Sequence, residues 1–465
     1  MGENFRIGII SGKMGDVDGV SLEVNKWIQI LTGQGHTVFT IAGRYKNPVE
    51  AVPAENQFTL ERIRFDSDLQ KYYEKHAFPH LHEHPAQVND VNKKDVIENI
   101  TSEGSVVAHE LYDYIKESDI DFIIGQNTNA MPMTLLGGMG IYKLSTERRV
   151  ATIFHHHDFW WERSRFSNNN IEPLLTKIMP PADLGIEHIV LSSYAAHILR
   201  SLKRVNPEII PNCENFDDPV TIDDYNSDFR KEFGFSEKDF LIVQPTRIVR
   251  RKRLEDSLEL VSLLARKYPD LKNRVHLIVS LYQGDEPDRS YVQEINRTAH
   301  QKGVPLHLIA DRVSSVRGLN EAGKKLYTNR DVLAHADIVT YLPIWEGFGN
   351  ALIEAITARA PIVTTTYLVY KTDIMGIGLN NIEIRNNYDQ DGRLVINDQT
   401  LDEMYFIMTH PVERKEIVDR NFEIARRNFG FDTLRLKLNG VIADYSDEIR
   451  ASRKRLKKSK MSYSV

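Results

Sequence analysis

Short apolar runs alternate with helical periodicity along the first part of the chain. The run 5–11 (FRIGIIS) is followed by Val20, Val24 and Leu31 at helical spacing, and a second apolar run spans 36–42. A strand, a helix and a second strand in this order form the repeating unit of a parallel α/β sheet. Further strands of this sheet are predicted at 121–125, 150–156 and 187–192.

The same rhythm starts again after a break in composition near residue 210. Ile210-Pro211-Asn212 is followed by an acidic, proline-containing stretch up to Asp224, which is typical of a linker between domains. Two doubly wound α/β domains in series are therefore predicted, and ligands of such sheets bind at the carboxyl ends of the strands. Strands of the second domain are predicted at 240–244, 275–280, 306–310, 337–342 and 361–365, with helices at 254–265, 290–301 and 350–358.

Two segments depart from this rhythm. Residues 46–118 are polar, aromatic and rich in His and Glu, and we expect them to form an insertion over the carboxyl rim of the first sheet. The chain is helical from about Pro411, and 450–460 hold seven Lys or Arg in eleven residues. That basic segment is predicted to be either a solvated, frayed end or a weak contact with an anionic membrane. The expected domains are 1–215 and 236–425, with a linker at 216–235 and a helix at 426–465 that returns toward the first domain.

Bulk composition narrows the class of protein. The 465 residues carry a net charge of −6, whereas nucleic-acid binders usually carry a basic excess. No apolar run approaches the ~18–20 residues of a membrane span. The amino terminus runs directly into a strand, so no signal peptide is expected, and the single cysteine, Cys213, favours a reducing compartment. A cytoplasmic enzyme without a nucleic-acid partner is therefore expected.

The amino-terminal glycines do not indicate a dinucleotide site. Gly12, Gly15 and Gly19 do not make G-x-G-x-x-G, and the second strand ends at 42–44 (AGR) without an acid for a ribose. The sequence also lacks a Walker loop. These patterns argue against an NAD-dependent enzyme.

The strongest local signal lies at 343–355 (PIWEGFGNALIEA). A buried strand ends at Leu342, and a glycine-rich turn opens a helix whose first N–H groups form a site for an anion such as a pyrophosphate. Glu346 precedes the turn and Glu354 lies one to two turns into the helix. Two carboxylates beside a phosphate site suit sugar hydroxyls, although an isolated motif of this kind would more often be a flexible helix start with two surface acids.

A basic loop follows the first strand of the second domain, at 240–252 (FLIVQPTRIVRRK). Arg247 and Lys252 project from this loop before the next helix. Cations at the carboxyl end of a strand would neutralise a leaving diphosphate, whereas the alternative interpretation is a solvated basic loop. The two segments together favour a site for a nucleoside diphosphate sugar.

Another dense group of polar and aromatic residues lies at 155–163 (HHHDFWWER). Neighbouring strand residues point to opposite faces, so His155 and His156 are expected to be structural and not to share a metal ion. Aromatic faces and polar side chains at strand ends suit a sugar acceptor. The candidate acceptor ligands are Gln126, Asn127, Asp158, Trp160, Trp161 and Arg163.

The chain resembles the retaining glycosyltransferases commonly called family 4, which have the GT-B fold. The resemblance rests on Glu346 and Glu354 with seven residues between them, on Arg247 followed by Lys252, on the linker motif, and on a histidine–aspartate pair at 157–158. It implies two Rossmann-like domains that face each other across a cleft. It also implies catalytic roles for His157, Arg247, Lys252 and Glu346, and a donor site formed by Gly19, Arg247, Lys252, Glu346, Gly347, Phe348, Gly349, Asn350 and Glu354.

The chain departs from the family pattern at four positions. Cys213, Arg253 and Arg359 stand where the family usually has glycine, and Ser280 replaces a common glycine at a strand end. None of these changes removes a charged donor ligand. Arg253 and Ser280 are expected to reshape the backbone surroundings of the diphosphate.

The resemblance implies transfer with retention at the anomeric carbon and no required metal cofactor, with Mg²⁺ left open as a stimulator. The main interpretation is transfer of a hexose from a donor of the GDP-mannose or UDP-glucose type to a small polar or anionic acceptor, such as a compatible-solute precursor in mannosylglucosylglycerate or trehalose-type synthesis. The alternatives are a glycosyltransferase for lipid-linked or wall glycan, with membrane contact through 450–460, and a non-catalytic sugar-nucleotide sensor. The oligomeric state stays open, and a dimer is one of the options.

Overall fold

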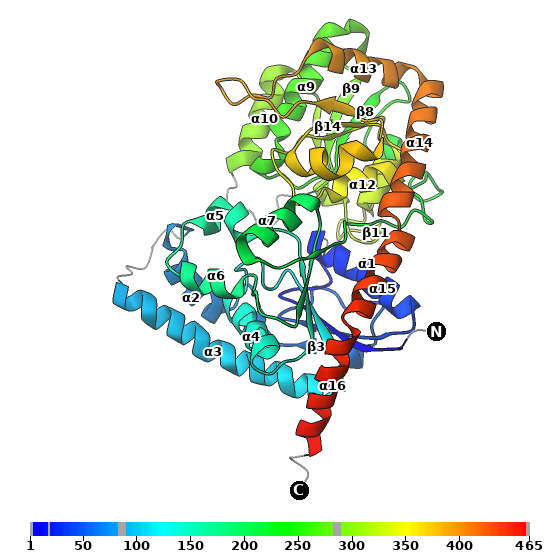
Figure 1. The fold of residues 1–465 in the computed structure, drawn as a ribbon. Helices are drawn as coiled ribbons and strands as arrows, with labels where there is room; N and C mark the ends of the chain where they lie inside the picture. The colour runs from blue at the N-terminus through cyan, green and yellow to red at the C-terminus, as the bar shows by residue number, and fades with distance from the viewer. Residues whose placement is uncertain (1–2, 17–18, 82–89, 282–289, 462–465) are drawn as a thin grey trace. The chain divides into compact units, whose positions relative to one another are not determined.

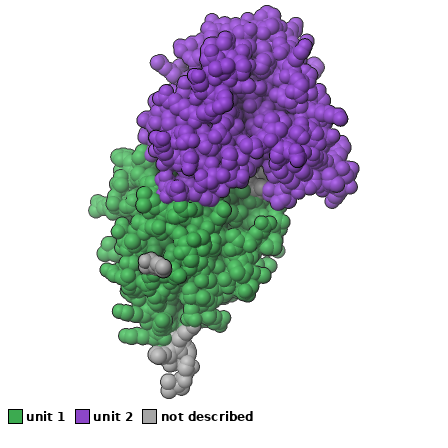
Figure 2. Space-filling view, turned by 90° about the vertical axis from the view of Figure 1, so that its right-hand side faces the viewer, with its two compact units in different colours: residues 1–211, 434–465 green, residues 212–433 purple. Residues whose placement is uncertain are grey.

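The computed structural model describes residues 3–16, 19–81, 90–281 and 290–461. The chain divides into two compact units (Figure 2). Unit 1 comprises Met1–Pro211 and Leu434–Val465, and unit 2 comprises Asn212–Thr433. The chain therefore passes from one unit to the other twice, and each unit is described by itself below.

Unit 1 is drawn in blue to green in Figure 1, with its carboxy-terminal helices in red. It contains a seven-stranded parallel sheet with the order β3-β2-β1-β4-β5-β6-β7. In register, Ile9 lies opposite Thr40 on one side and Ile124 on the other. The strand order reverses between β1 and β4, because β2 and β3 extend the sheet on one side and β5 to β7 on the other. Its strands are β1 (Arg6–Ser11), β2 (Thr37–Ala42), β3 (Gln57–Thr59), β4 (Phe122–Gln126), β5 (Thr152–His156), β6 (Ile186–Val190) and β7 (Glu208–Ile209).

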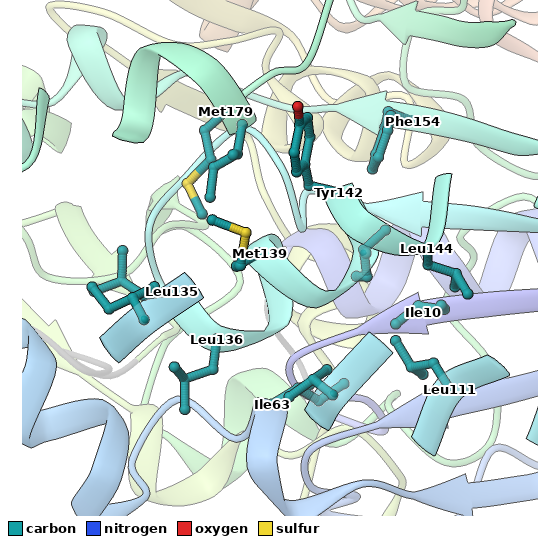
Figure 3. Packing of buried hydrophobic residues seen from close by; sticks show 14 of the residues in the cluster. Ile10, Ile63, Leu111, Leu135, Leu136, Met139, Tyr142, Leu144, Phe154 and Met179 are labelled. Carbon is teal, nitrogen blue, oxygen red and sulfur yellow. The ribbon is translucent and has the colours of Figure 1, made fainter. Parts of the chain in front are cut away.

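Helices cover this sheet, and their buried side chains form the core that Figure 3 shows in part. Two of them approach closely at glycines: a Cβ atom at Gly104 would lie 2.2 Å from Met139 Cγ, and one at Gly140 would lie 2.4 Å from Val107 Cγ1. The helices of unit 1 are α1 (Gly19–Gly33), α2 (Asp68–Ala77), α3 (Asp90–Glu117), α4 (Leu135–Thr146), α5 (Ser164–Ser167), α6 (Glu172–Ile178), α7 (Ser193–Lys203), α15 (Phe431–Asp444) and α16 (Ser446–Met461), with 3-10 turns η1 (Ala54–Asn56), η2 (Glu61–Ile63), η3 (Pro79–Leu81) and η4 (Trp160–Glu162).

The predicted insertion at 46–118 contains β3, α2, α3 and three short 3-10 turns. Residues 82–89, which include part of its His-rich stretch, lie outside the described residues. The long helix α3 packs against α4, and its apolar side contributes Val96, Ile100 and Leu111 to the core. Most of the insertion is therefore helical and belongs to the hydrophobic core of unit 1.

The basic carboxy-terminal segment is a helix that packs on unit 1. Ile449, Ser452 and Leu456 are buried along one side of α16, and the Ala151 N–H donates to Ser452 Oγ at 3.0 Å. Arg453 donates to both carboxylate oxygens of Asp121, at 2.5 and 2.8 Å. The expectation of a frayed end is wrong for this described part, because a stripe of buried side chains and a partly buried ion pair hold the helix. Five cations of this helix are exposed among its described side chains, namely Arg450, Lys454, Arg455, Lys457 and Lys458.

Unit 2 contains a six-stranded parallel sheet with the order β10-β9-β8-β13-β14-β15. The order reverses between the neighbouring strands β8 and β13, where Ile242 pairs with Ile338. Its strands are β8 (Phe240–Gln244), β9 (Val275–Val279), β10 (Leu306–Leu308), β13 (Ile338–Tyr341), β14 (Ile362–Thr365) and β15 (Ile382–Ile384), and a separate antiparallel pair is formed by β11 (Gly318–Leu319) and β12 (Lys325–Leu326).

The long helices of unit 2 are amphipathic and bury their apolar sides on this sheet. In α9, for example, Leu254, Leu258 and Val261 recur at helical spacing and are buried. The helices of unit 2 are α8 (Phe229–Glu232), α9 (Leu254–Lys267), α10 (Ser290–Lys302), α11 (Asn329–Ala334), α12 (Asn350–Thr357), α13 (Asp398–Thr409) and α14 (Pro411–Phe429), with short turns η5 (Arg250–Lys252), η6 (Pro269–Leu271), η7 (Ala310–Arg312), η8 (Tyr370–Ile374) and η9 (Met375–Ile377). Two parallel-sheet α/β units confirm the predicted fold class.

Candidate functional site

The two predicted donor segments of unit 2 leave neighbouring strands at the point where the strand order reverses. The loop 245–253 follows β8, and the turn 343–349 follows β13. Loops on either side of such a reversal diverge and leave a crevice at the carboxyl ends of the strands, where ligands of open α/β sheets bind. The topology therefore brings together two segments that lie about 90 residues apart in sequence.

Gly349 gives the turn before α12 its shape. Its φ is +131°, a conformation that residues with a Cβ rarely adopt, and a Cβ atom there would lie 2.5 Å from the Tyr367 hydroxyl. That hydroxyl donates to the Phe348 carbonyl at 2.6 Å. The turn is thus fixed by glycine and a buried tyrosine, and it presents the first N–H groups of α12 at the carboxyl end of the sheet.

We predict that Gly349→Ala destabilises unit 2 by about 1–3 kcal/mol and weakens nucleotide binding, because the new methyl group strains the backbone and displaces Tyr367. Melting temperatures with and without nucleoside diphosphate measure both effects. Gly376→Ala is the matched control, since no atom lies within 4 Å of its Cβ position. Equal melting curves for the two variants would contradict the role given to Gly349.

Three of the charged residues at this reversal are in direct contact. Lys252 and Arg251 both form ion pairs with Glu346 Oε1. The Lys252 ammonium also lies 5.0 Å from the centre of the Tyr341 ring, close enough for a cation–π contact. The Tyr341 hydroxyl is buried and has no hydrogen-bond partner among the described residues. The pair Lys252–Glu346, predicted from two distant motifs, therefore forms one cluster.

Burial controls the charge of Lys252. Removal from water lowers the pKa of its ammonium to about 8, while the neighbouring Glu346 carboxylate acts in the opposite direction. Lys252 is therefore largely charged below pH 8 and increasingly neutral above it. An anionic ligand placed beside it would raise this pKa, because opposite charge favours the protonated form.

We expect kcat/KM for the donor to fall as pH rises through about 8, because the free enzyme then loses the Lys252 charge that attracts the diphosphate. A pH profile of initial rates at low donor concentration measures this fall, which forms the alkaline limb of the profile. In a Lys252→Arg variant the limb is expected to disappear, because a guanidinium stays charged across the range. An unchanged alkaline limb in that variant would show that another group titrates.

The remaining predicted donor residues lie around α12. Asn350, its first residue, accepts a hydrogen bond at Oδ1 from Asn212 of the linker motif. Phe348 is buried against Phe429, with ring centres 5.4 Å apart, so its side chain supports the turn. Glu354 lies in the second turn of α12, where Asn329 Nδ2 donates to its Oε2 at 3.0 Å. Arg247 and Gly347 are half-buried in the two loops.

In unit 1, polar residues gather where β4 and β5 end. Gln126 Oε1 lies 2.8 Å from His155 Nδ1 and 3.4 Å from His157 Nε2. The His157 N–H donates to Asn127 Oδ1 at 3.1 Å, and Asn127 adopts a left-handed backbone with a φ of +55°. The structure therefore brings together the predicted residues Gln126, Asn127 and His157 in one hydrogen-bonded group.

Asp158 connects this group with Arg163. Its carboxylate accepts from Asn127 Nδ2 at 3.2 Å and from Arg163 Nε at 2.8 Å. The ion pair holds the guanidinium beside the end of β5 and neutralises part of its charge. Asp158 is thus a bridge between two predicted acceptor residues.

The two predicted tryptophans differ in their surroundings. Trp160 is buried, and its indole N–H donates to the Met179 carbonyl at 2.9 Å, so its ring serves the core of unit 1. Trp161 is half-buried and stacks on Phe159 with ring centres 4.6 Å apart. Gly19 is the exposed first residue of α1, on the segment that follows β1.

His155 and His156 are structural, as the alternation of strand residues predicts. His155 stacks on Trp27 at 4.2 Å between ring centres, and His156 Nε2 lies 3.0 Å from His188 Nδ1. Burial lowers the pKa of both imidazoles well below the usual value, so both stay neutral. No group of three His, Cys, Asp or Glu side chains suited to a metal ion occurs within 3–16, 19–81, 90–281 and 290–461.

Two of the family departures occupy the backbone conformation that favours glycine. Arg253 has a φ of +53° and Arg359 one of +51°. Arg253 donates to Asp256 Oδ2 at 2.7 Å, and Arg359 donates to Asp419 Oδ1 at 3.0 Å. These ion pairs hold both arginines in place, so the turns exist here without glycine.

Three residues of the unit 2 site were not predicted from the sequence. Arg251 belongs to the predicted basic loop, yet it contacts Glu346. Tyr341 reads as a strand residue, and Asn329 carries no motif, although their positions beside Lys252 and Glu354 give each a place in the site. Of these three residues, only Tyr341 carried a signal in the sequence. A buried strand needs only an apolar side chain at its end, so a hydroxyl-bearing tyrosine there indicates a further role.

Comparison with known proteins agrees with this geometry. Residues 226–372 match the family described as "Glycosyl transferases group 1". The chain is 29% identical to a mannosylglucosylglycerate synthase of Thermotoga maritima over 445 residues, which cover 92% of this chain and 98% of that protein. It is also 29% identical to a mannosylglucosylglycerate synthase of Petrotoga mobilis over 397 residues, which cover 82% of this chain and 86% of that protein.

Solved structures share the fold at low sequence identity. Sucrose-phosphate synthase from Thermosynechococcus elongatus superposes with a TM-score of 0.62 at 13% identity, over 95% of this chain and 99% of that one. The Anabaena protein HepE in complex with UDP-glucose superposes with a TM-score of 0.58 at 13% identity, over 95% of this chain and all of that one. None of the helices built from described residues has the length and apolar character needed to cross a membrane. With its site residues at the strand-order reversals, the chain is a glycosyltransferase of the GT-B fold, and its residues 226–372 are similar to the group 1 family.

Proposed function

We propose that this enzyme makes mannosylglucosylglycerate, by moving a mannosyl group from a nucleoside diphosphate mannose to glucosylglycerate with retention at the anomeric carbon. The observation that carries the proposal is the 29% identity to the Thermotoga maritima synthase along 98% of that protein's length. The contact between Lys252 and Glu346 at the start of α12 supports it, because this cluster has the charges that a sugar diphosphate requires.

The residues of unit 2 would act on the leaving group. As the sugar–phosphate bond breaks, negative charge grows on the diphosphate, and Lys252, Arg247 and the first N–H groups of α12 stabilise that charge more in the transition state than in the ground state. Glu346 would position the transferred sugar, and Glu354 the ribose. The departing phosphate oxygen would take the proton of the acceptor hydroxyl, so no pair of carboxylates of the glycosidase type is needed.

No metal ion is required in this scheme, because the cations of unit 2 meet the diphosphate directly. Transfer is therefore expected to continue at the same rate after dialysis against EDTA. Loss of activity with EDTA and its return with Mg²⁺ would contradict this part of the proposal.

The acceptor would be held by unit 1. His157 and Asp158 lie at the end of β5, and Gln126 and Asn127 fix their orientation. Glucosylglycerate carries a carboxylate, for which Arg163 and Arg165 are the nearest candidates in this segment. Arg163 already pairs with Asp158, whereas Arg165 is exposed, with its guanidinium 4.4 Å from the centre of the Phe166 ring.

Glucosylglycerol, which lacks the carboxylate, tests the choice of acceptor. We expect a much higher kcat/KM for glucosylglycerate than for this neutral analogue, because a lost charge-assisted hydrogen bond costs about tenfold or more. An Arg165→Met variant is expected to reduce that preference. Equal rates with both acceptors would contradict an anionic acceptor.

The alternative of a lipid-linked acceptor has one supporting observation, the five exposed cations of α16 at 450, 454, 455, 457 and 458. Cosedimentation with vesicles containing anionic phospholipid tests it. Binding at physiological salt, together with transfer to a lipid-linked sugar, would favour this alternative over glucosylglycerate.

A further inference from the structure

A chain of two hydrogen bonds leads from the end of β9 to Glu354. Ser280, directly after β9, donates from Oγ to Asn329 Oδ1 at 2.6 Å. Asn329, the first residue of α11, donates from Nδ2 to Glu354 Oε2 at 3.0 Å. Three separate elements of unit 2 thus meet at one carboxylate.

The two hydrogen bonds hold the Asn329 amide from both sides. The Glu354 carboxylate only accepts hydrogen bonds, so the NH₂ group of Asn329 must face it and the amide oxygen must face Ser280. The Ser280 hydroxyl donates to that oxygen and restrains the position of the amide. Ser280 therefore supports the contact between Asn329 and Glu354 without touching Glu354 itself.

The surroundings keep this chain rigid. Ser280 is fully buried, and the start of α11 is held by a capping box in which Thr328 and Asp331 exchange hydrogen bonds. Asp331 is fixed in turn by an ion pair with Arg317. Glu354 consequently receives its hydrogen bond from a side chain with little freedom to move.

We propose that Ser280 and Asn329 are positioning residues that orient Glu354 toward the ribose hydroxyls of the donor nucleotide, and that they thereby set the preference for ribonucleotides over deoxyribonucleotides. The inference rests on the proposed function, in which Glu354 contacts the ribose. It also gives a reason for serine at a position where the related family usually has glycine. A glycine there supplies no hydroxyl, so Asn329 would lose the hydrogen bond that restrains its amide on the side away from Glu354.

Calorimetric titration with GDP, 2′-deoxy-GDP and 3′-deoxy-GDP tests this positioning role, with the corresponding uridine nucleotides used if UDP gives the larger melting shift. The variants are Ser280→Ala, Ser280→Gly, Asn329→Ala and Glu354→Gln. Ser257→Ala is the matched control, because Ser257 is also a fully buried serine of unit 2 and its hydroxyl has no partner among the described residues.

The wild-type chain and Ser257→Ala are expected to bind GDP about tenfold more tightly than the weaker deoxynucleotide, the effect of one hydrogen bond to a charged group. In the other variants this ratio is expected to fall to about threefold or less, mainly through weaker GDP binding. Ser280→Ala combined with Glu354→Gln is expected to lower the ratio no further than Glu354→Gln alone, since both act through the same contact.

Full discrimination in Ser280→Ala and Asn329→Ala would overturn the proposal, and so would an equal loss of affinity for all three nucleotides, which marks a merely structural role. The partly exposed position of Asn329 keeps the test valid if the buried Ser280 variants do not fold. Because these titrations need neither sugar nor acceptor, they are independent of the transfer assay. A chain that shows this discrimination but does not glycosylate glucosylglycerate would contradict the proposed acceptor alone.

Discussion

Lys252→Ala is expected to lower kcat/KM for the nucleotide sugar by about two to three orders of magnitude, the usual effect of removing one preorganised group that stabilises a developing anion. Lys252 lies at the reversal of the strand order, and burial brings its pKa to about 8, so its charge acts in a weakly hydrated environment. Steady-state kinetics with the donor varied, at saturating acceptor, measures the loss. Both kcat and kcat/KM should fall, because the charge of the leaving group is greatest in the transition state.

The control for this variant is Lys272→Ala, which removes an exposed lysine of the same unit. Melting temperatures of both variants separate loss of catalysis from loss of folding. Glu346 keeps its ion pair with Arg251 in Lys252→Ala, so unit 2 is expected to stay folded. Transfer at the wild-type rate by a folded Lys252→Ala protein would remove Lys252 from the mechanism.

Glu346→Gln is expected to have the second largest effect, a loss of about two orders of magnitude in kcat. The substitution keeps the size of the side chain but removes the charge that pairs with Lys252 and Arg251. The Glu346 carboxylate raises the pKa of Lys252 against the effect of burial. Its removal should therefore move the alkaline limb of the pH profile to lower pH.

This shift distinguishes a functional pair from two residues that merely lie close together. If Glu346→Gln lowers kcat but leaves the alkaline limb at the wild-type pH, Lys252 is not the group that titrates. Glu346→Asp serves as the control, because it keeps the charge and is expected to keep the limb. The double variant Lys252→Ala with Glu346→Gln should lose less than the product of the single losses, since the two side chains are in contact.

Much of the fold could be predicted because its strands are short apolar runs between helices of clear periodicity. The prediction of 240–244 coincides with β8, and that of 254–265 lies within α9. The short strands β7 and β15 were not predicted, because runs of two or three residues carry little pattern of their own. The packing of α16 escaped for another reason, since its buried Ile449 and Leu456 are hidden among lysines and arginines.

Site residues that belong to sequence motifs could be predicted. Site residues that are defined only by contacts between distant segments could not. The spacing of Glu346 and Glu354 and the basic loop with Lys252 identified two segments, and the sheet topology then brought Lys252 and Glu346 together. The hydrogen bond between Asn329 and Glu354 could not be foreseen, because it joins the first residue of α11 to the second turn of α12, and no sequence pattern relates the two. Trp160 was predicted as an acceptor ligand from its residue type, but its buried indole donates its N–H to the Met179 carbonyl and packs in the core.

The most direct test of the proposed function is product analysis by proton NMR after incubation of the enzyme with GDP-mannose and glucosylglycerate. We expect one mannosylglucosylglycerate product whose mannosyl group keeps the anomeric configuration of the donor, with release of one GDP for each product formed. Absence of this product with a folded, nucleotide-binding enzyme, or a product with inverted configuration, would contradict the proposed function.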